Sequence, residues 1–267
     1  MLLIISSITP ILGLTGAGTV TLTGSCSQSV VNASHNYVNF SLINYGNQSA
    51  SGLIIAPRIV GAETYNSYAS LQYLSPYQNY STRFYLYNFS EPGAYADAFV
   101  VQYSQGSSTF YALFPCLVNV LSATQSLVGI SSINQTGDRV AVSVVNLQDY
   151  PVNVIISSIV PPSFNASPAQ EYIDVGAGSH SKATFNISYP TGYSASYAVA
   201  FASSYSEGGK HYSSIDTYTV NTSPAKSGAT AAGYLFFGGI ALIFAVLVVL
   251  IVISVIKSKK GPRTGST

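Results

Sequence analysis

Side chains that could bind a metal or carry out catalysis are scarce in this sequence. It has 267 residues, of which 3 are His, 2 are Cys and 9 are Asp or Glu. The histidines are far apart and have no carboxylates at the spacing of metal ligands: His35, His180 and His211. A blue-copper site needs two His, a Cys and usually an axial Met, but no His lies near Cys116 and the one Met is Met1. We predict no metal site and no cofactor.

The motifs of common enzyme families are also absent. The sequence contains no Gly-x-Ser-x-Gly elbow, no glycine-rich phosphate loop and no His-Glu-x-x-His pair. A calcium site is one alternative, built from three carboxylates that we otherwise interpret as solvated turn residues: Asp138, Asp149 and Asp174. A glycosidase pair is another, but the acids are scattered over predicted turns. We predict that the protein is not an enzyme.

The two cysteines, Cys26 and Cys116, both precede the apolar segment described below. Two cysteines in an oxidising compartment are expected to form a disulfide. Closing a loop of this length contributes about 4–5 kcal/mol in the chain-entropy model. Two buried free thiols are the alternative.

The most frequent chemical motif is the N-glycosylation acceptor Asn-x-Ser/Thr. Nine of the fifteen asparagines match it, whereas composition alone would give about three. The nine acceptors are Asn32, Asn39, Asn47, Asn79, Asn88, Asn134, Asn165, Asn186 and Asn221. We predict a glycoprotein, and the alternative is compositional bias of a surface rich in Ser and Asn.

Tyrosine is abundant, with 21 copies, and it is densest between residues 65 and 87. Exposed aromatic rings can stack on sugars or bind other proteins. The candidate binding patch consists of Tyr73, Tyr77, Tyr80 and Tyr85. The alternative is structural, because tyrosine has high β-propensity and fits a half-buried strand.

An internal repeat indicates how these residues are positioned. Residues 95–106 (YADAFVVQYSQG) and 197–208 (YAVAFASSYSEG) are identical at seven of twelve positions, an offset of 102 residues. Within each copy apolar residues alternate with polar ones, as in Val38, Phe40 and Leu42. About seven short strands in roughly 100 residues is typical of an immunoglobulin-like sandwich. Strands are expected at 52–60, 70–74, 80–89, 95–104 and 109–120, and at 151–160, 170–175, 181–189, 195–205 and 211–221.

The carboxy-terminal end predicts a membrane anchor. No charged residue occurs from Ala229 to Ile256, and about 20 apolar residues in a helix suffice to cross a bilayer. Four basic residues follow and predict a cytoplasmic tail: Lys257, Lys259, Lys260 and Arg263. All nine acidic residues precede the span, together with six basic ones. The charge pattern therefore places the preceding residues outside the cell.

The predicted fold class is all-β: two tandem immunoglobulin-like β-sandwiches plus one C-terminal transmembrane α-helix. The sandwiches span 18–120 and 121–222, and a stalk (223–230), the helix (231–256) and a basic tail (257–267) follow. Residues 1–17 form an N-terminal apolar segment with small residues at its end. We interpret this segment as a signal peptide. No Lys or Arg precedes it, as would be usual, so two alternatives stay open: a retained membrane anchor, or neither a signal peptide nor an anchor.

One turn supports a family comparison. Residues 44–50 (NYGNQSA) follow a predicted strand and resemble the N-x-G-x-x-x-A pattern of CARDB-like domains. The second copy keeps Asn146 but has Gln148 at the position of Gly46. The resemblance implies an immunoglobulin-like, cell-adhesion-related module of archaeal or bacterial surface or S-layer-associated proteins. It implies no catalytic residue.

These features together predict a single-pass cell-surface protein with a structural, adhesive or S-layer-associated role. The expected partners are the lipid bilayer, other envelope or membrane proteins and glycans. Nucleic acid is not expected, because the predicted outer part has no basic stripe. The alternatives are an accessory subunit of a transporter or respiratory assembly, and an extracellular carbohydrate-binding module.

Overall fold

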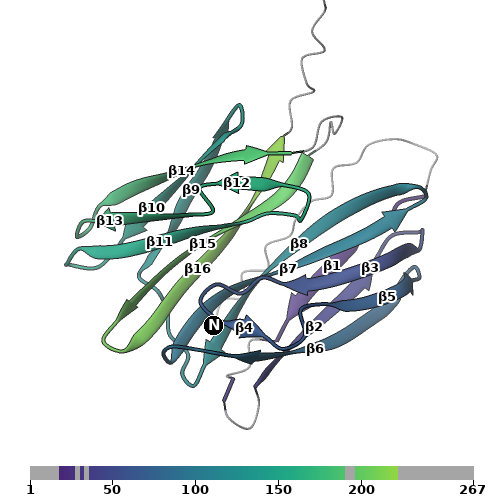
Figure 1. Cartoon of the computed structure of the whole chain (residues 1–267), viewed down its shortest axis with the longest axis horizontal. Coiled ribbons are helices and arrows are strands. Elements are labelled where there is room, and N and C mark those ends of the chain that lie inside the picture. Colours follow the sequence, from purple (N-terminus) through teal and green to yellow (C-terminus); the bar gives the residue numbers. More distant parts are fainter. Residues whose placement is uncertain (1–17, 28–30, 33–35, 190–195, 222–267) are drawn as a thin grey trace, which may run out of the picture. The chain divides into compact units, whose positions relative to one another are not determined.

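The computed structural model describes residues 18–27, 31–32, 36–189 and 196–221, which form sixteen β-strands and no helix (Figure 1). Over these residues the predicted all-β fold class is confirmed. No helix within the described ranges is long and apolar enough to cross a bilayer. The predicted span 231–256, the stalk, the basic tail and the apolar segment 1–17 lie outside the described residues.

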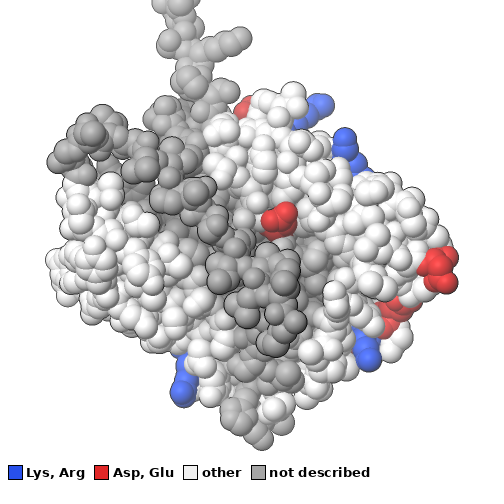
Figure 2. Space-filling model, turned by 180° about the vertical axis from the view of Figure 1, so that it is seen from behind, with Lys and Arg blue, Asp and Glu red and all other residues white. Residues whose placement is uncertain are grey.

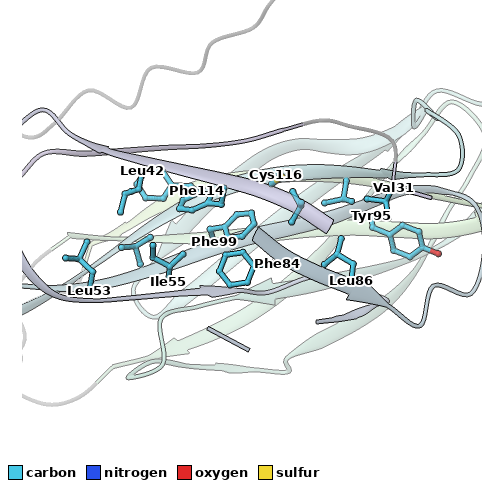
Figure 3. Packing of buried hydrophobic residues seen from close by; sticks show 14 of the residues in the cluster. Val31, Leu42, Leu53, Ile55, Phe84, Leu86, Tyr95, Phe99, Phe114 and Cys116 are labelled. Atoms are coloured by element: carbon cyan, nitrogen blue, oxygen red, sulfur yellow. The ribbon is translucent and has the colours of Figure 1, made fainter. Parts of the chain in front are cut away.

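Eight strands of the first half form two facing antiparallel sheets, with order β1-β2-β6-β4 and β5-β3-β7-β8. Figure 3 shows the core between them, where Phe84 and Phe99 lie side by side, with ring centroids 5.4 Å apart. The strands are β1 (Leu22–Cys26), β2 (Tyr37–Asn44), β3 (Ala50–Pro57), β4 (Glu63–Thr64), β5 (Ala69–Leu74), β6 (Asn79–Tyr87), β7 (Gly93–Gln105) and β8 (Ser108–Val120).

The second half has the same strand order, in sheets β9-β10-β14-β12 and β13-β11-β15-β16. Its strands are β9 (Val128–Thr136), β10 (Arg139–Asn146), β11 (Val152–Ile159), β12 (Asn165–Ser167), β13 (Gln170–Val175), β14 (His180–Ser188), β15 (Ser196–Glu207) and β16 (Lys210–Asn221). Strands β10, β11 and β16 begin 102 residues after β2, β3 and β8. The offset of the sequence repeat is thus the offset between equivalent strands of two immunoglobulin-like sandwiches.

The strongest part of the repeat lies on β7 and β15, and both faces of these strands are buried. Tyr95 and Phe99 point into the first core, and Phe201 points into the second. The alanines between them point the other way, because side chains alternate along a strand. Ala98 and Ala200 belong to a third cluster, which also contains residues from β8 and β11. The repeated segment therefore serves a core on one face and the contact between the halves on the other.

Strands β7 and β16 join the two halves within the compact unit formed by residues 1–222. His211 pairs with Gly93 in parallel orientation, and its N–H donates to Pro92 O at 2.9 Å. The imidazole ring stacks on Tyr95, with centroids 4.1 Å apart. Through this junction the larger sheets of the two halves form one eight-stranded sheet, with β5 and β13 at its ends.

The asparagine of the surface-protein pattern is a buried structural residue. Asn44 is 0% exposed; its Nδ2 donates to Gln48 O at 2.7 Å and to Leu74 O at 3.0 Å. Asn146 makes the equivalent bonds in the second half, to Tyr150 O at 2.8 Å and Val175 O at 3.1 Å. Each asparagine ties the turn after its strand to the end of the strand at the sheet edge.

The glycine of the same pattern is explained by a crossing of the backbone. A Cβ on Gly46 would overlap Thr19 O, because residues 19–21 pass directly over this turn. At the equivalent position Gln148 is buried, and its Nε2 donates to Tyr205 OH at 3.0 Å. The second copy therefore departs from the pattern at this position because the Gln148 side chain fills the space that the backbone of residues 19–21 occupies in the first copy.

The predicted disulfide is confirmed. Cys26 at the end of β1 is bonded to Cys116 on β8, with Cα atoms 6.1 Å apart. The bond links the two facing sheets of the first half, and Cys116 lies in the core (Figure 3). The equivalent residues of the second half are Val128 and Tyr218, which cannot form such a bond.

Candidate interaction surface

The predicted tyrosine patch is divided by the structure. Tyr80 packs against the first core and is half-buried. Tyr73 on β5 and Tyr77 in the turn after it are 56% and 74% exposed. Tyr85 is 43% exposed and lies near the other end of β6 from Tyr80. The four residues therefore do not form one row.

Tyr73 and Tyr77 belong with a tyrosine that the sequence did not single out. Tyr45 is 54% exposed and follows the buried Asn44. The N–H of Tyr77 donates to Asn44 O at 2.6 Å, which brings the two turns together. Tyr77 has a φ of 60°, a left-handed conformation that costs a non-glycine residue about 1 kcal/mol. The hydrogen bonds around Asn44 thus hold three exposed tyrosines at one end of the sandwich.

Tyr85 belongs to a second aromatic group on the outer face of β2 and β6. Its ring meets Tyr37 edge to face, with centroids 5.8 Å apart. The Arg83 guanidinium lies 4.7 Å from the centroid of the Tyr37 ring, and its Nε donates to Asn39 Oδ1 at 3.2 Å. This group is held by cation–π and edge contacts on the sheet surface.

A carboxylate lies next to this second group, but its oxygens are already bound. Tyr87 OH donates to Glu63 Oε2 at 2.7 Å and Asn88 Nδ2 donates to Glu63 Oε1 at 3.0 Å. These hydrogen bonds lower the pKa of Glu63, and the bond to Glu63 raises the pKa of Tyr87. The Tyr65 ring lies 4.2 Å from that of Tyr87. The arrangement orders the Glu63–Tyr65 segment and supplies no second carboxylate for acid–base chemistry.

The nine glycosylation acceptors are distributed unevenly between the sheets. Eight side chains are exposed, and Asn39 is half-buried with its Oδ1 bonded to Arg83. Five acceptors lie on strands of the smaller sheets, namely β2, β6, β9, β12 and β14, and Asn47 and Asn88 lie in the loops after β2 and β6. Asn32 follows Val31, which pairs with Val120 of β8 in the larger sheet. Of the nine, only Asn221 lies on the eight-stranded sheet, as the last residue of β16.

Charged side chains are sparse on the surface. On the face shown in Figure 2, Lys, Arg, Asp and Glu occur as isolated groups separated by uncharged atoms. Among the described residues no three His, Cys, Asp or Glu side chains come together. Asp138, Asp149 and Asp174 therefore do not converge as the calcium alternative requires, and His35 lies outside the described residues.

Two grooves lie among the described residues, and polar side chains are more frequent in the lining of the second. One, of about 500 Å³, lies where residues 58–61 face residues 157–160, and Arg58 is its charged residue. The other, of about 460 Å³, lies on β11, β13 and β15 and is lined by Tyr172, Asp174 and His211 among others. In the second groove Ser206 Oγ lies 3.5 Å from His211 Nδ1, and the partner of His211 Nε2 is the Ser213 hydroxyl rather than the carboxylate of a catalytic triad.

A buried carboxyl with a strongly raised pKa is that of Asp97 on β7, a residue that the sequence did not indicate as functional. Its side chain is 0% exposed and its Oδ1 accepts the N–H of Arg58 at 2.9 Å, while Oδ2 has no hydrogen-bond partner among the described residues. Burial raises the pKa of Asp97 from 3.8 to about 7. It lies opposite Cys116 in the β7–β8 register, and the equivalent residue of the second half is Val199. The carboxyl is enclosed by the core and reaches no groove described above.

His211 is a second buried group with a shifted pKa, at the junction of the halves. Its Nε2 lies 3.1 Å from Ser213 Oγ, and its Nδ1 lies 3.5 Å from Ser206 Oγ. Burial lowers the pKa of His211, and the charge of Glu91 acts weakly in the opposite direction. With Tyr95 stacked on the ring, this histidine has a structural position.

No family model and no curated protein matches this sequence. Among solved structures the chain is similar to the YadV chaperone, with 12% identity over 74% of this chain and 99% of that one and a TM-score of 0.30. A chaperone–tip adhesion subunit complex from Csu pili of Acinetobacter baumannii matches with 10% identity over 62% of this chain and 89% of that chain, with a TM-score of 0.30. Red sea bream transglutaminase matches with 12% identity over 76% of this chain and 31% of that chain, with a TM-score of 0.27.

Proposed function

We propose that this protein is a glycosylated, single-pass cell-surface protein with a structural or adhesive role and no enzymatic activity. The observation that carries the proposal is that seven of the nine acceptor asparagines lie on or beside the smaller sheets, while Asn32 and Asn221 lie at the eight-stranded sheet. Glycans on the smaller sheets would cover them with bulky, soluble groups. The larger sheet would stay available for contacts with other proteins.

Two further observations support an outward location. The Cys26–Cys116 disulfide is of the kind that persists in oxidising compartments. The sequence from Ala229 to Ile256, followed by four basic residues, has the length and flanking charge of a membrane anchor with a cytoplasmic end. Low surface charge also fits a protein whose solubility comes from hydroxyls, amides and sugars.

The test is glycopeptide mapping of protein purified from its native cells. We expect sugars at the exposed acceptors and the lowest occupancy at Asn39, because that side chain is half-buried and bonded to Arg83. Asn44 and Asn146 are buried asparagines outside the motif and serve as internal controls.

A membrane-impermeant amine reagent applied to intact cells tests the orientation. Lys182 on β14 is exposed and should be labelled, whereas Lys257, Lys259 and Lys260 should react only after lysis. Unmodified asparagines together with labelling restricted to lysed cells would contradict the proposed function.

A further inference from the structure

Most strands at the edges of the described sheets carry a feature that prevents pairing with another chain. Strands β4 and β12 are only 2 and 3 residues long. Strand β1 has only five residues, with Gly24 at its centre, and β9 is tied to β16 by Gln135, whose side chain bonds both backbone groups of Asn221. Strand β8 contains Pro115. Short length, coverage and proline are recognised ways of blunting a sheet edge.

The two ends of the eight-stranded sheet differ in this respect. Strand β13 carries two carboxylates, Glu171 and Asp174, and charge on an edge discourages pairing. Strand β5 pairs with β3 and has no second partner strand among the described residues. Its sequence, ASLQYL, contains no charged residue, no proline and no glycine. Unlike β4, β8, β9, β12 and β13, strand β5 has neither a short length, nor a proline, nor a cover, nor a charge.

The side chains of β5 suit pairing with another strand. Leu71 packs against the first core and Leu74 is buried at the end of the strand, so the strand is fixed in place. Ser70 and Gln72 are exposed, and Tyr73 is 56% exposed. Uncharged, β-prone residues along an open edge favour addition of a strand, because main-chain groups then gain hydrogen bonds.

We propose that β5 pairs in antiparallel orientation with β5 of a second copy of this chain. The new contact would continue the existing eight-stranded sheet of each copy across a two-fold axis. Charge decides between the possible partner edges. A β13–β13 pair brings like charges together, and β5 has no cation to complement the two carboxylates of β13. A β5–β5 pair brings no charges together, and its two-fold symmetry uses the same edge of both copies, so the assembly stops at a dimer. The inference depends neither on glycosylation nor on membrane anchoring.

A two-fold axis makes a specific geometric prediction. Residues near the centre of an isologous antiparallel pair lie next to their own symmetry copies. The centre of β5 falls between Leu71 and Gln72. Gln72 is therefore within one residue of the axis in each register that pairs five or six residues, and its side chain is exposed.

Thiol crosslinking of the full chain in mild detergent tests this prediction. Gln72→Cys treated with a short thiol–thiol crosslinker should give covalent dimers. The matched control is Tyr172→Cys on β13, an edge position that is 74% exposed. At about 10 μM protein we expect the first variant to crosslink about a hundredfold faster, because pairing holds the thiols at an effective concentration near millimolar. Both variants contain the same segment 223–267, so any association through that segment contributes equally.

A charge variant gives an independent readout. The double change Ser70→Lys and Gln72→Lys should abolish the dimer in sedimentation experiments, whereas Tyr172→Lys should leave it intact. Equal crosslinking rates for the two cysteine variants would overturn the proposal. Slow amide exchange of β5 that does not change with protein concentration would also overturn it, because the edge would then be covered by the protein's own chain.

Discussion

At the scale of single residues, Asp97 distinguishes the two halves most clearly. In the second half the equivalent position holds Val199, an apolar residue that is also 0% exposed. In the first half the carboxyl gains one backbone hydrogen bond and leaves Oδ2 without a partner. A neutral, protonated carboxyl is less costly to bury than a charged one. Burial therefore favours the protonated form of Asp97 and raises its pKa to about 7.

Replacement of this carboxyl should change how stability depends on pH. The folded-state pKa of Asp97 is raised from 3.8 to about 7, so the folded state keeps a proton that the unfolded chain releases. That stabilisation is complete below pH 3.8 and is lost as pH rises through about 7. Asp97→Asn stays neutral and keeps an oxygen for the Arg58 N–H. We expect the variant to gain stability relative to the wild type across this range, up to about 4 kcal/mol.

The measurement is urea unfolding of both proteins at several pH values between 4 and 8. His211 titrates with the opposite sign: its pKa is lowered, so its stabilisation is present above the ordinary value of 6.5 and is lost as pH falls through the folded-state pKa. Both proteins contain His211, so the difference between them isolates Asp97. A difference that does not vary with pH would contradict the prediction.

Residue types predicted the disulfide but not the buried acid. Only two cysteines occur, and both were predicted to lie in an oxidising compartment, so a disulfide between them could be predicted without the fold. Asp97 did leave a signal, because it occupies a core-facing position in the alternation between Tyr95 and Phe99. The exposed Tyr45 left none, because its exposure depends on how the turn packs against residues 75–78.

At the scale of elements, the disulfide joins β1 of one sheet to β8 of the facing sheet. Removing it with Cys26→Ala and Cys116→Ala frees a loop of 90 residues in the unfolded chain. We expect a loss of about 4–5 kcal/mol in the chain-entropy model, concentrated in the first half. Hydrogen exchange would locate the loss, through faster exchange of amides in β1 and β8.

The second half provides the control for this prediction, because Val128 and Tyr218 hold the equivalent positions. Amides of β9 and β16 should keep their exchange rates in the double alanine variant. Uniform acceleration across both halves would show instead that the two sandwiches unfold as a single unit.

The longer strands were largely predictable from the sequence and the short ones were not. Alternation of apolar and polar residues indicated β2, β3, β7 and β8, together with their equivalents 102 residues later. Strands β4 and β12 contain too few residues to show a period. Their positions are set by pairing with β6 and β14, which are distant contacts that local pattern does not encode.

At the scale of the whole molecule, Gly93 controls the junction between the halves. Its φ is 148°, and a Cβ there would overlap the carbonyl group of His211. Gly93→Ala should therefore separate β16 from β7 and cost about 1–3 kcal/mol. The connecting residues 121–127 should then be cleaved faster by protease, because Thr124 Oγ1 donates to His211 O at 3.2 Å.

Gly106→Ala is the matched control for this variant. Gly106 has a φ of 61°, but a Cβ there would meet nothing within 4 Å. The control suffers the backbone strain without the collision, so the 121–127 segment should keep its wild-type cleavage rate. Equal rates in the two variants would contradict a role for Gly93 at the junction.

The repeat predicted two similar halves but not how they join. Equivalent residues differ at the junction, where His211 of the second half corresponds to Thr109 of the first. The sequence repeat consists of residues that are identical in the two halves. The junction is formed by residues that differ between the halves, so the repeat does not predict it. Distant pairing of this kind is visible only once both sheets are built.

The position of the disulfide also affects how the protein would carry a mechanical load. Strand β5 lies inside the covalent loop closed by Cys26 and Cys116. A pulling force applied to β5 reaches Cys116 by two covalent routes, one through β6, β7 and β8 and one back through β3, β2 and the sulfur atoms. From Cys116 a single chain continues to the carboxy-terminal end. In the first half such a load is therefore shared between two covalent arms, whereas in the second half, which has no disulfide, a single chain carries all of it.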